Sequence, residues 1–161
     1  MLLVSRLLKP ISYVRQWDQS YGGTSGDILF AITPTADGNY LLAGLSNSGI
    51  NGNKTTPNIG NADFWVVKID VNGNPLWDRT YGGTANDQLR NIVPLPDGGF
   101  LLGGRSVSAI GGTKTVASNA VNVFDYYVVK IDASGTQVWD NVYGGTSADL
   151  FSRIIPTTDG G

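Results

Sequence analysis

Aspartate is the residue type in this chain that could most readily carry out chemistry. All 13 acidic residues among the 161 are Asp, and the chain contains neither His nor Cys. Without an imidazole or a thiol, Ser-His-Asp and Cys-His catalysis, thiolate metal sites and disulfide bonds are excluded. The residue types that remain for chemistry are Asp, Lys, Arg, Tyr, Ser and Thr, and among them the carboxylates are the most useful test for an active site.

The Asp residues occur at repeating positions, which argues against such a catalytic role. They form these sets of equivalent positions: Asp18, Asp78 and Asp140; Asp27, Asp87 and Asp149; Asp37, Asp97 and Asp159; Asp63 and Asp125; Asp70 and Asp132. A catalytic carboxylate is normally placed once, in a pocket that shifts its pKa. Copied carboxylates are better explained as turn caps that accept backbone N–H bonds. We therefore expect no enzymatic activity and no cofactor, and a structural role for Asp27, Asp87 and Asp149.

These positions belong to a longer repeat. The stretch DFWVVKIDVNGNPLWDRTYGG at 63–83 returns as DYYVVKIDASGTQVWDNVYGG at 125–145, with 12 of 21 positions identical. Trp-Asp begins at positions 17, 77 and 139, and Tyr-Gly-Gly-Thr at 21, 81 and 143, so the period is 60 and then 62 residues. A fixed period of this size marks an array of supersecondary units.

Each repeat predicts four short β-strands and no helix. The apolar runs are separated by turn signals such as Asp-Gly and Asn-Gly, which supply the positive φ of tight hairpins. The predicted strands are 27–34, 40–44, 64–69 and 75–80, then 87–94, 100–104, 126–131 and 137–142, and a further first strand at 149–156. The third strands are nearly apolar on both faces, as in a sheet that is covered on both sides.

Four antiparallel strands that stack on similar neighbours are typical of a β-propeller blade. We therefore predict an all-β fold of four-stranded blades in an incomplete, propeller-like array. The predicted segments are a non-repeat leader at 1–10, the fourth strand of a preceding blade at 11–20, one blade at 21–80, a second at 81–142 and the start of a third at 143–161. Since propellers usually close with about 4–8 blades, further blades would come from a longer chain or from self-assembly.

The repeat resembles a known family. Its pattern is Trp-Asp-x-x-Tyr-Gly-Gly-Thr-x-x-Asp, then Asp-Gly-Gly-Phe-Leu-Leu-Gly-Gly, then Tyr-Val-Val-Lys-Ile-Asp-x-x-Gly. This is similar to the propeller-like repeats of large secreted bacterial proteins, many of which carry a type IX secretion sorting domain. The resemblance covers 17–161 and implies export to the cell surface or the medium, without supplying catalytic residues. Looser likenesses link 131–139 to quinoprotein repeats, and Gly103, Gly104, Tyr127 and Trp139 to kelch repeats.

The candidate ligand-binding residues form two groups. The first lies in the loops between second and third strands, because loops on a rigid scaffold often carry recognition. It consists of Asn51, Lys54, Thr55, Lys114 and Thr115, whose partial repetition also fits a structural turn. The second group, which varies between the copies, consists of Arg90, Arg105 and Arg153. Arg90 and Arg153 fall on predicted first strands, which would line a central channel.

Two further motifs allow both a functional and a structural interpretation. The flat rings of Trp17, Trp77 and Trp139 could stack on sugars, but their strict repetition favours packing of one blade on the next. Asp70 and Asn72 resemble the start of a calcium loop that lacks its bidentate glutamate. A hairpin turn is the favoured interpretation of that stretch, and no other metal site is expected.

These observations together predict a non-catalytic binding, adhesion or scaffold module of an exported bacterial protein. Its partner would be a polysaccharide or a surface protein, met through the loops between second and third strands. The alternatives are a partial propeller of a secreted hydrolase or lyase, and a structural spacer without a ligand. The net charge of −2 comes with scattered Lys and Arg, which argues against nucleic acid as a partner. No segment reaches the roughly 20 apolar residues of a membrane span.

Overall fold

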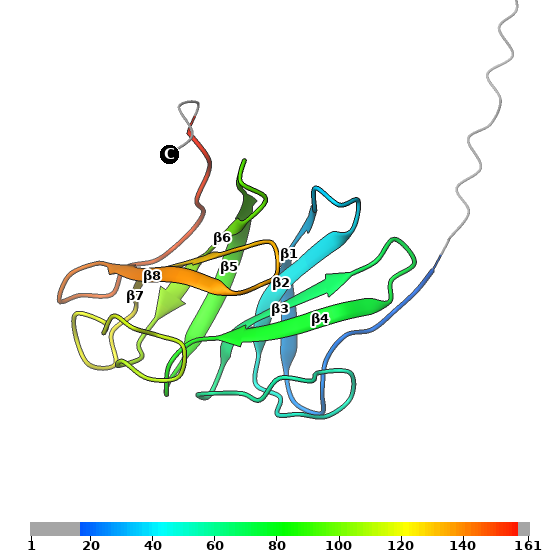
Figure 1. Cartoon of the computed structure of the whole chain (residues 1–161). Helices are drawn as coiled ribbons and strands as arrows, with labels where there is room; N and C mark the ends of the chain where they lie inside the picture. Colours follow the sequence, from blue (N-terminus) through cyan, green and yellow to red (C-terminus); the bar gives the residue numbers. More distant parts are fainter. Residues whose placement is uncertain (1–16, 158–161) are drawn as a thin grey trace, which may run out of the picture.

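The computed structural model describes residues 17–157, which form two antiparallel sheets of four strands each (Figure 1). The first sheet contains β1 (Asp27–Pro34), β2 (Tyr40–Ser46), β3 (Asp63–Ile69) and β4 (Pro75–Tyr81). The second sheet contains β5 (Asp87–Pro94), β6 (Phe100–Ser106), β7 (Asp125–Ile131) and β8 (Gln137–Tyr143). The predicted all-β class is confirmed. The described residues form no helix that could cross a membrane.

The predicted bounds of these eight strands are accurate to within two residues. The strand predicted at 149–156 is wrong, because residues 144–157 form no strand. A strand needs a hydrogen-bonded neighbour, and β1 and β5 each pair with the strand that follows them. Residues 149–156 have no such following strand among the described residues.

The two ends of the predicted array are only partly described. Residues 17–20, which belong to the predicted fourth strand of a preceding blade, are not in a strand. The predicted leader at 1–10, residues 11–16 and the turn at 158–161 lie outside the described residues. The assignment of these ends therefore stays a prediction.

The main core lies between the two sheets. Its buried members are Leu41, Ala43, Phe64, Val66, Tyr81, Leu89, Ile92, Phe100, Leu102, Tyr127, Val129 and Ile131. The rings of Phe64 and Tyr127 meet across this interface with their centres 5.2 Å apart. Burying one such large apolar side chain contributes about 1.5–3 kcal/mol, so contact with its neighbour is a major source of stability for each sheet.

The opposite face of the first sheet is only partly covered. It carries a second apolar cluster made of Leu42, Trp65, Val67 and Ile69, with Tyr21 and Tyr40 packed against it. A hollow of about 220 Å³ opens beside this cluster. Leu29 and Ile32 on β1 are 56% and 57% exposed, whereas their equivalents Leu89 and Ile92 on β5 are 0% and 7% exposed. The first sheet covers β5, and no described sheet precedes β1 to cover it in the same way.

A β-bulge interrupts the first strand of each sheet. The register shifts at Phe30 in β1 and at Arg90 in β5, so each of these residues is left out of the ladder. A bulge re-aims the side chain of its extra residue. The Arg90 guanidinium carbon lies 4.5 Å from the centre of the Phe30 ring, which connects the two first strands.

Candidate functional site

The two loop lysines are buried rather than presented to solvent. Lys54 and Lys114 are each 1% exposed. The Lys54 ammonium donates to the Thr56 carbonyl and to Thr80 Oγ1, both at 2.8 Å, and lies 5.4 Å from the centre of the Trp65 ring. Burial lowers the pKa of both lysines, and nearby carboxylates oppose that effect. The expectation that these loops offer a lysine to a ligand is therefore wrong in this structure.

The same loops are held at their base by buried carboxylates. Asp78 accepts hydrogen bonds from the Thr55 backbone and hydroxyl, and from Trp65 Nε1 at 2.9 Å. Burial disfavours the charged form of Asp78, but these hydrogen bonds outweigh it and hold its pKa below the usual value. Asp140 binds the backbone and hydroxyl of Thr115 in the equivalent way. Thr55 and Thr115 therefore use their polar groups within the loop.

Asn51, the remaining loop candidate, is half-buried and also uses its side chain within the fold. Its Oδ1 accepts a hydrogen bond from the Thr24 backbone N–H at 2.5 Å, which links the loop to the segment before β1. These loops also expose apolar side chains, since Ile50 is 65% exposed, Ile110 63% and Val121 87%, beside exposed polar residues such as Asn53, Thr55 and Thr115. Lys54 and Lys114 are therefore buried, and Asn51, Thr55 and Thr115 use side-chain oxygen atoms in hydrogen bonds within the fold; a ligand-binding role for these five residues stays a prediction.

Asp27 and Asp87, the first residues of β1 and β5, and the equivalent Asp149 cap the turns that precede them. Asp27, Asp87 and Asp149 accept the backbone N–H of Gly23, Gly83 and Gly145, at 2.8, 2.7 and 3.0 Å. Asp27 and Asp87 also accept the hydroxyls of Ser48 and Ser108. This is the arrangement expected of capping carboxylates, because each one satisfies an otherwise unpaired backbone donor.

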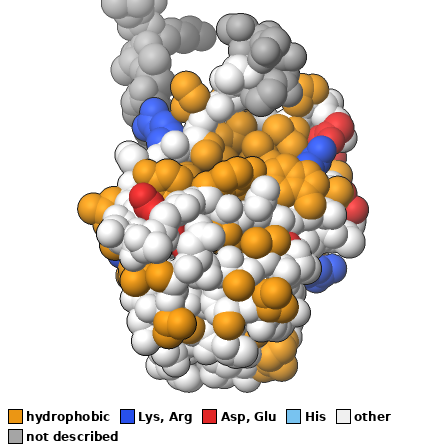
Figure 2. Space-filling model, turned by 90° about the vertical axis from the view of Figure 1, so that its left-hand side faces the viewer, with side chains coloured by type: hydrophobic (Ala, Val, Ile, Leu, Met, Phe, Trp, Pro, Cys, Tyr) orange, Lys and Arg blue, Asp and Glu red, His pale blue; other side chains and the backbone are white. Residues whose placement is uncertain are grey.

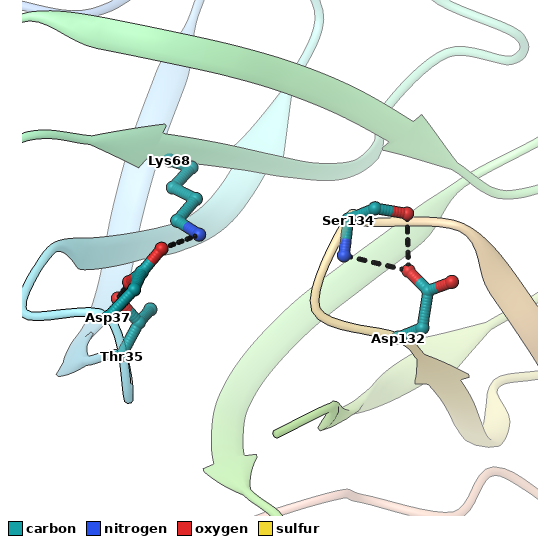
Figure 3. Close-up of polar contacts among 5 residues, drawn as sticks. All are labelled: Thr35, Asp37, Lys68, Asp132 and Ser134. Carbon is teal, nitrogen blue, oxygen red and sulfur yellow. Dashed lines mark hydrogen bonds and ion pairs between the residues drawn. The ribbon is translucent and has the colours of Figure 1, made fainter. Parts of the chain in front are cut away.

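The calcium candidate is a hydrogen-bonded hairpin turn. Asp70 Oδ1 accepts the backbone N–H of Asn72 and of Asn74, both at 2.8 Å, and Oδ2 accepts Asn74 Nδ2. Asp132 does the same with Ser134 in the second sheet (Figure 3). Within residues 17–157 no three His, Cys, Asp or Glu side chains form a group that could hold a metal ion. The oxygen atoms of this stretch serve the turn.

Two of the three repeated tryptophans pack between units, as expected. A Cβ added to Gly73 would lie 2.8 Å from the Trp17 ring, and one added to Gly135 would lie 2.9 Å from the Trp77 ring. Trp17 Nε1 also donates to the Val71 carbonyl at 2.9 Å. These contacts join the end of one unit to the hairpin turn of the next. Trp139 has no such neighbour in the described part of the chain and is 41% exposed.

The structure brings two of the three candidate arginines together. Arg105 Nε and Nη2 donate to Gln88 Oε1 at 3.0 and 2.7 Å, and Arg90 Nη2 donates to the same atom at 3.2 Å. The Arg105 guanidinium also lies 4.2 Å from the centre of the Phe124 ring, at the end of the 107–124 loop. Arg153, in contrast, is exposed and lies outside any strand.

No carboxylate among the described residues pairs with Arg90 or Arg105. The ion pairs found in that part of the chain are Lys68–Asp37 at 2.6 Å, drawn in Figure 3, and Lys130–Asp97 at 2.7 Å. Burial lowers the pKa of Arg105, and the charge of Arg90 adds to this effect. The arrangement therefore holds two like charges around one neutral oxygen atom, which chemically suits an anion.

Sequence reasoning missed Gln88, the residue that joins the two arginines. A signal for it was present, because Gln88 and Arg90 occupy positions that hold Ile28 and Phe30 in the preceding copy. A polar residue at a position that is apolar in another copy indicates a role that the copies do not share.

Comparison with known proteins assigns no family to this chain. No family model matches it, and no curated protein is significantly similar to it. The resemblance to repeats of secreted bacterial proteins rests on the motifs alone and stays a prediction.

Proposed function

We propose that this chain is a non-catalytic binding module of an exported bacterial protein, built from propeller-like blades, and that it binds an acidic polysaccharide through Arg90 and Arg105. The observation that carries the proposal is the pair of guanidinium groups around Gln88 Oε1, with no carboxylate partner in the described part of the chain. The exported location comes from the motif resemblance.

The chemistry of the arginine pair favours a carboxylate or sulfate group as ligand. A guanidinium presents parallel N–H donors that match such an anion in a bidentate manner. Two guanidinium groups at one point repel each other, and a bound anion would replace that repulsion with attraction. A polysaccharide that carries uronic acid or sulfate groups offers many such anions in series, so that several weak contacts add up.

A non-catalytic role is supported by the positions and the hydrogen bonds of the aspartates. The carboxylates of both sheets recur at equivalent positions and accept hydrogen bonds from turns and loop bases. A hydrolase or lyase would need one carboxylate set apart from the repeat. A single Asp substitution that abolished turnover of a polysaccharide without changing the melting temperature would favour the enzymatic alternative.

Calorimetric titration of the full chain with a polyuronate and with a neutral glucan tests the proposal. We expect heat only with the polyuronate, and weaker binding as salt rises, because the contact is ionic. The R90A/R105A double variant should bind at least about tenfold more weakly. R79A is the matched control: Arg79 is exposed on β4, over the Trp77 ring, and its loss should leave binding unchanged.

Gln88→Glu separates loss of binding from loss of folding. The substitution places a carboxylate at the atom that both arginines already approach, so it should keep or raise the melting temperature while it abolishes polyuronate binding. Unchanged binding by Q88E would reject the arginine pair as the site. Binding to an acidic surface protein in place of the polyuronate would change the partner class. The absence of binding to either would favour a spacer.

A further inference from the structure

The sequence Trp-Asp-x-x-Tyr-Gly-Gly occurs three times, and its first two copies make the same contacts with the unit that follows each of them. We name residues 17–25, 77–85 and 139–147 the first, second and third junction segments. The Tyr21 hydroxyl donates to the Gly73 carbonyl, and the Tyr81 hydroxyl to the Gly135 carbonyl, both at 2.6 Å. With the tryptophan contacts described above, the first two junction segments each bind the hairpin turn between the third and fourth strands of the next sheet.

The first two junction segments also bind the long loop of the next sheet. The Gly22 carbonyl accepts the Asn53 backbone N–H at 3.1 Å, and the Gly82 carbonyl accepts the Thr113 N–H at 3.0 Å. Two further equivalent hydrogen bonds are 3.0 Å long. The Ser25 backbone N–H donates to Ser48 Oγ, and the Ala85 backbone N–H donates to Ser108 Oγ. The first and second junction segments therefore make the same hydrogen bonds to a turn and to a loop.

Among residues 17–157, the third junction segment has none of these partners. Trp139 and Tyr143 are 41% and 52% exposed, whereas Tyr81 in the second junction segment is 2% exposed. A Cβ added to Gly145 would meet nothing within 4 Å, whereas one added to Gly83 would collide with the next loop. Figure 2 looks at the side of the molecule where β8 and the red segment after it lie, and it shows hydrophobic side chains gathered across the upper half of that face.

The residues after the third junction segment already follow the path of a next unit. Phe151 meets Tyr126 of β7 edge-on, with ring centres 5.8 Å apart. Ile154 lies beside Gly103 of β6. In the second sheet, the equivalent positions on β5 are the ones that pack on the first sheet. The outer face of the second sheet therefore continues an interface that the chain already contains.

From these contacts we infer that the third junction segment is a docking site for a further unit of this same repeat. The partner must offer a hairpin turn with a glycine in the left-handed region, as at Gly73 and Gly135, where φ is 82°. Any larger residue there would strain the backbone and collide with the docking tryptophan. It must also offer a serine at the position of Ser48 and Ser108. The inference does not depend on the arginine pair or on polysaccharide binding.

A second copy of the chain supplies this partner for an experiment. Its Gly73 turn has the required form but is occupied by Trp17 and Tyr21 of the same copy. The W17A/Y21A variant of the full chain frees that turn. In sedimentation velocity we expect this freed variant to associate head to tail at least about tenfold more tightly than the unaltered chain. Adding W139A and Y143A to it should abolish the association.

The control is the unaltered chain with W139A and Y143A alone, whose melting temperature should not change because both side chains are exposed. Association of the freed variant that persists after W139A and Y143A would overturn the inference, because it would reflect non-specific apolar contact. A freed variant that melts cooperatively and stays monomeric would also overturn it.

If the freed variant does not fold, Y21A alone, which removes one of the two side chains that occupy the Gly73 turn, is compared with Y21A/W139A/Y143A at millimolar concentration. Weaker association of the triple variant supports the docking site, and equal sedimentation of the two overturns it.

Discussion

Asp63 Oδ1 and Asp87 Oδ2 face each other across Gly82, where the second junction segment leads into β5. Both aspartates are fully buried, and Oδ1 of each has no hydrogen-bond partner. Burial raises the pKa of Asp63 to about 6; backbone hydrogen bonds from Gly60 and Ile59 oppose the shift, and the charge of Asp87 adds to it. Burial of Asp63, reinforced by the nearby charge of Asp87, makes this junction sensitive to protonation.

The first prediction concerns pH. Because the pKa of Asp63 is about 6 in the fold and about 4 in an unfolded chain, Asp63 favours folding most below pH 4. As the pH rises from about 4 to about 6 that contribution is lost, and the free energy of unfolding falls by about 1–3 kcal/mol. We expect Asp63→Asn to be more stable than the unaltered chain at pH 7 and to remove this slope. Urea unfolding at several pH values measures both effects.

Asp97→Asn is a control of opposite sign for this pH dependence. The hydrogen bond from Lys130 is the largest cause that lowers the pKa of Asp97. Its contribution to stability is therefore present above about pH 4 and lost at lower pH. A D63N variant that kept the slope between pH 4 and 6 would show that another group causes it.

The second prediction concerns the glycine between the two carboxylates. A Cβ on Gly82 would collide with Asp63 Oδ1 and Asp87 Oδ2, whereas one on Gly98, in the β5–β6 turn, would meet nothing within 4 Å. Gly98→Ala therefore tests backbone strain alone, with a loss of about 1–2 kcal/mol. We expect Gly82→Ala to lower the unfolding free energy by more than that. Equal losses in thermal unfolding would contradict the close packing at this junction.

The third prediction compares two equivalent tyrosines. Tyr81→Phe removes a buried hydroxyl and leaves the Gly135 carbonyl without its donor, which should cost about 1–2 kcal/mol of unfolding free energy. Tyr143 is exposed, with its hydroxyl contacting only the nearby Asn141 side chain. Tyr143→Phe should change stability by less than about 0.5 kcal/mol. Similar melting temperatures for the two variants would show that the junction hydrogen bond adds little.

The fourth prediction concerns the base of the first long loop. Asp78→Asn would replace one of two acceptor oxygen atoms by a donor, facing the Thr55 N–H and the buried Trp65 Nε1. Leaving such donors unpaired should cost about 2–4 kcal/mol. Asp70→Asn, in an exposed turn, should cost clearly less. Amide hydrogen exchange should quicken in residues 51–56 of D78N, and unchanged protection there would argue against this anchor.

The features that sequence reasoning predicted are those fixed by neighbouring residues. Strand bounds follow from alternating apolar residues and glycine turns, and the caps follow from the preference of Asp for backbone N–H groups. The inter-unit role of Trp77 was predictable because its repetition matched the repetition of the turns. The absence of a strand at 149–156 was not predictable, because strand formation depends on a partner strand and not on the segment itself.

The features that were missed depend on distant residues. A lysine in a polar loop is normally exposed, and the burial of Lys54 depends in part on Thr80, on a strand 26 residues further along. Arg90 and Arg105 were each predicted as candidates, but their pairing depends on the register of the β5 bulge and on the contact between Gln88 and Arg105, which lie 17 residues apart in sequence. No local pattern contains that information.

The junction contacts also form in a fixed order during biosynthesis. Tyr81 leaves the ribosome before the residue that accepts its hydrogen bond, which lies 54 positions later in the chain. While an array of such units is being translated, each finished sheet therefore keeps its exposed aromatic pair until the next hairpin has emerged. The newest unit is then the one most prone to contact a neighbouring nascent chain, so a steady rate of elongation would itself protect these repeats from aggregation.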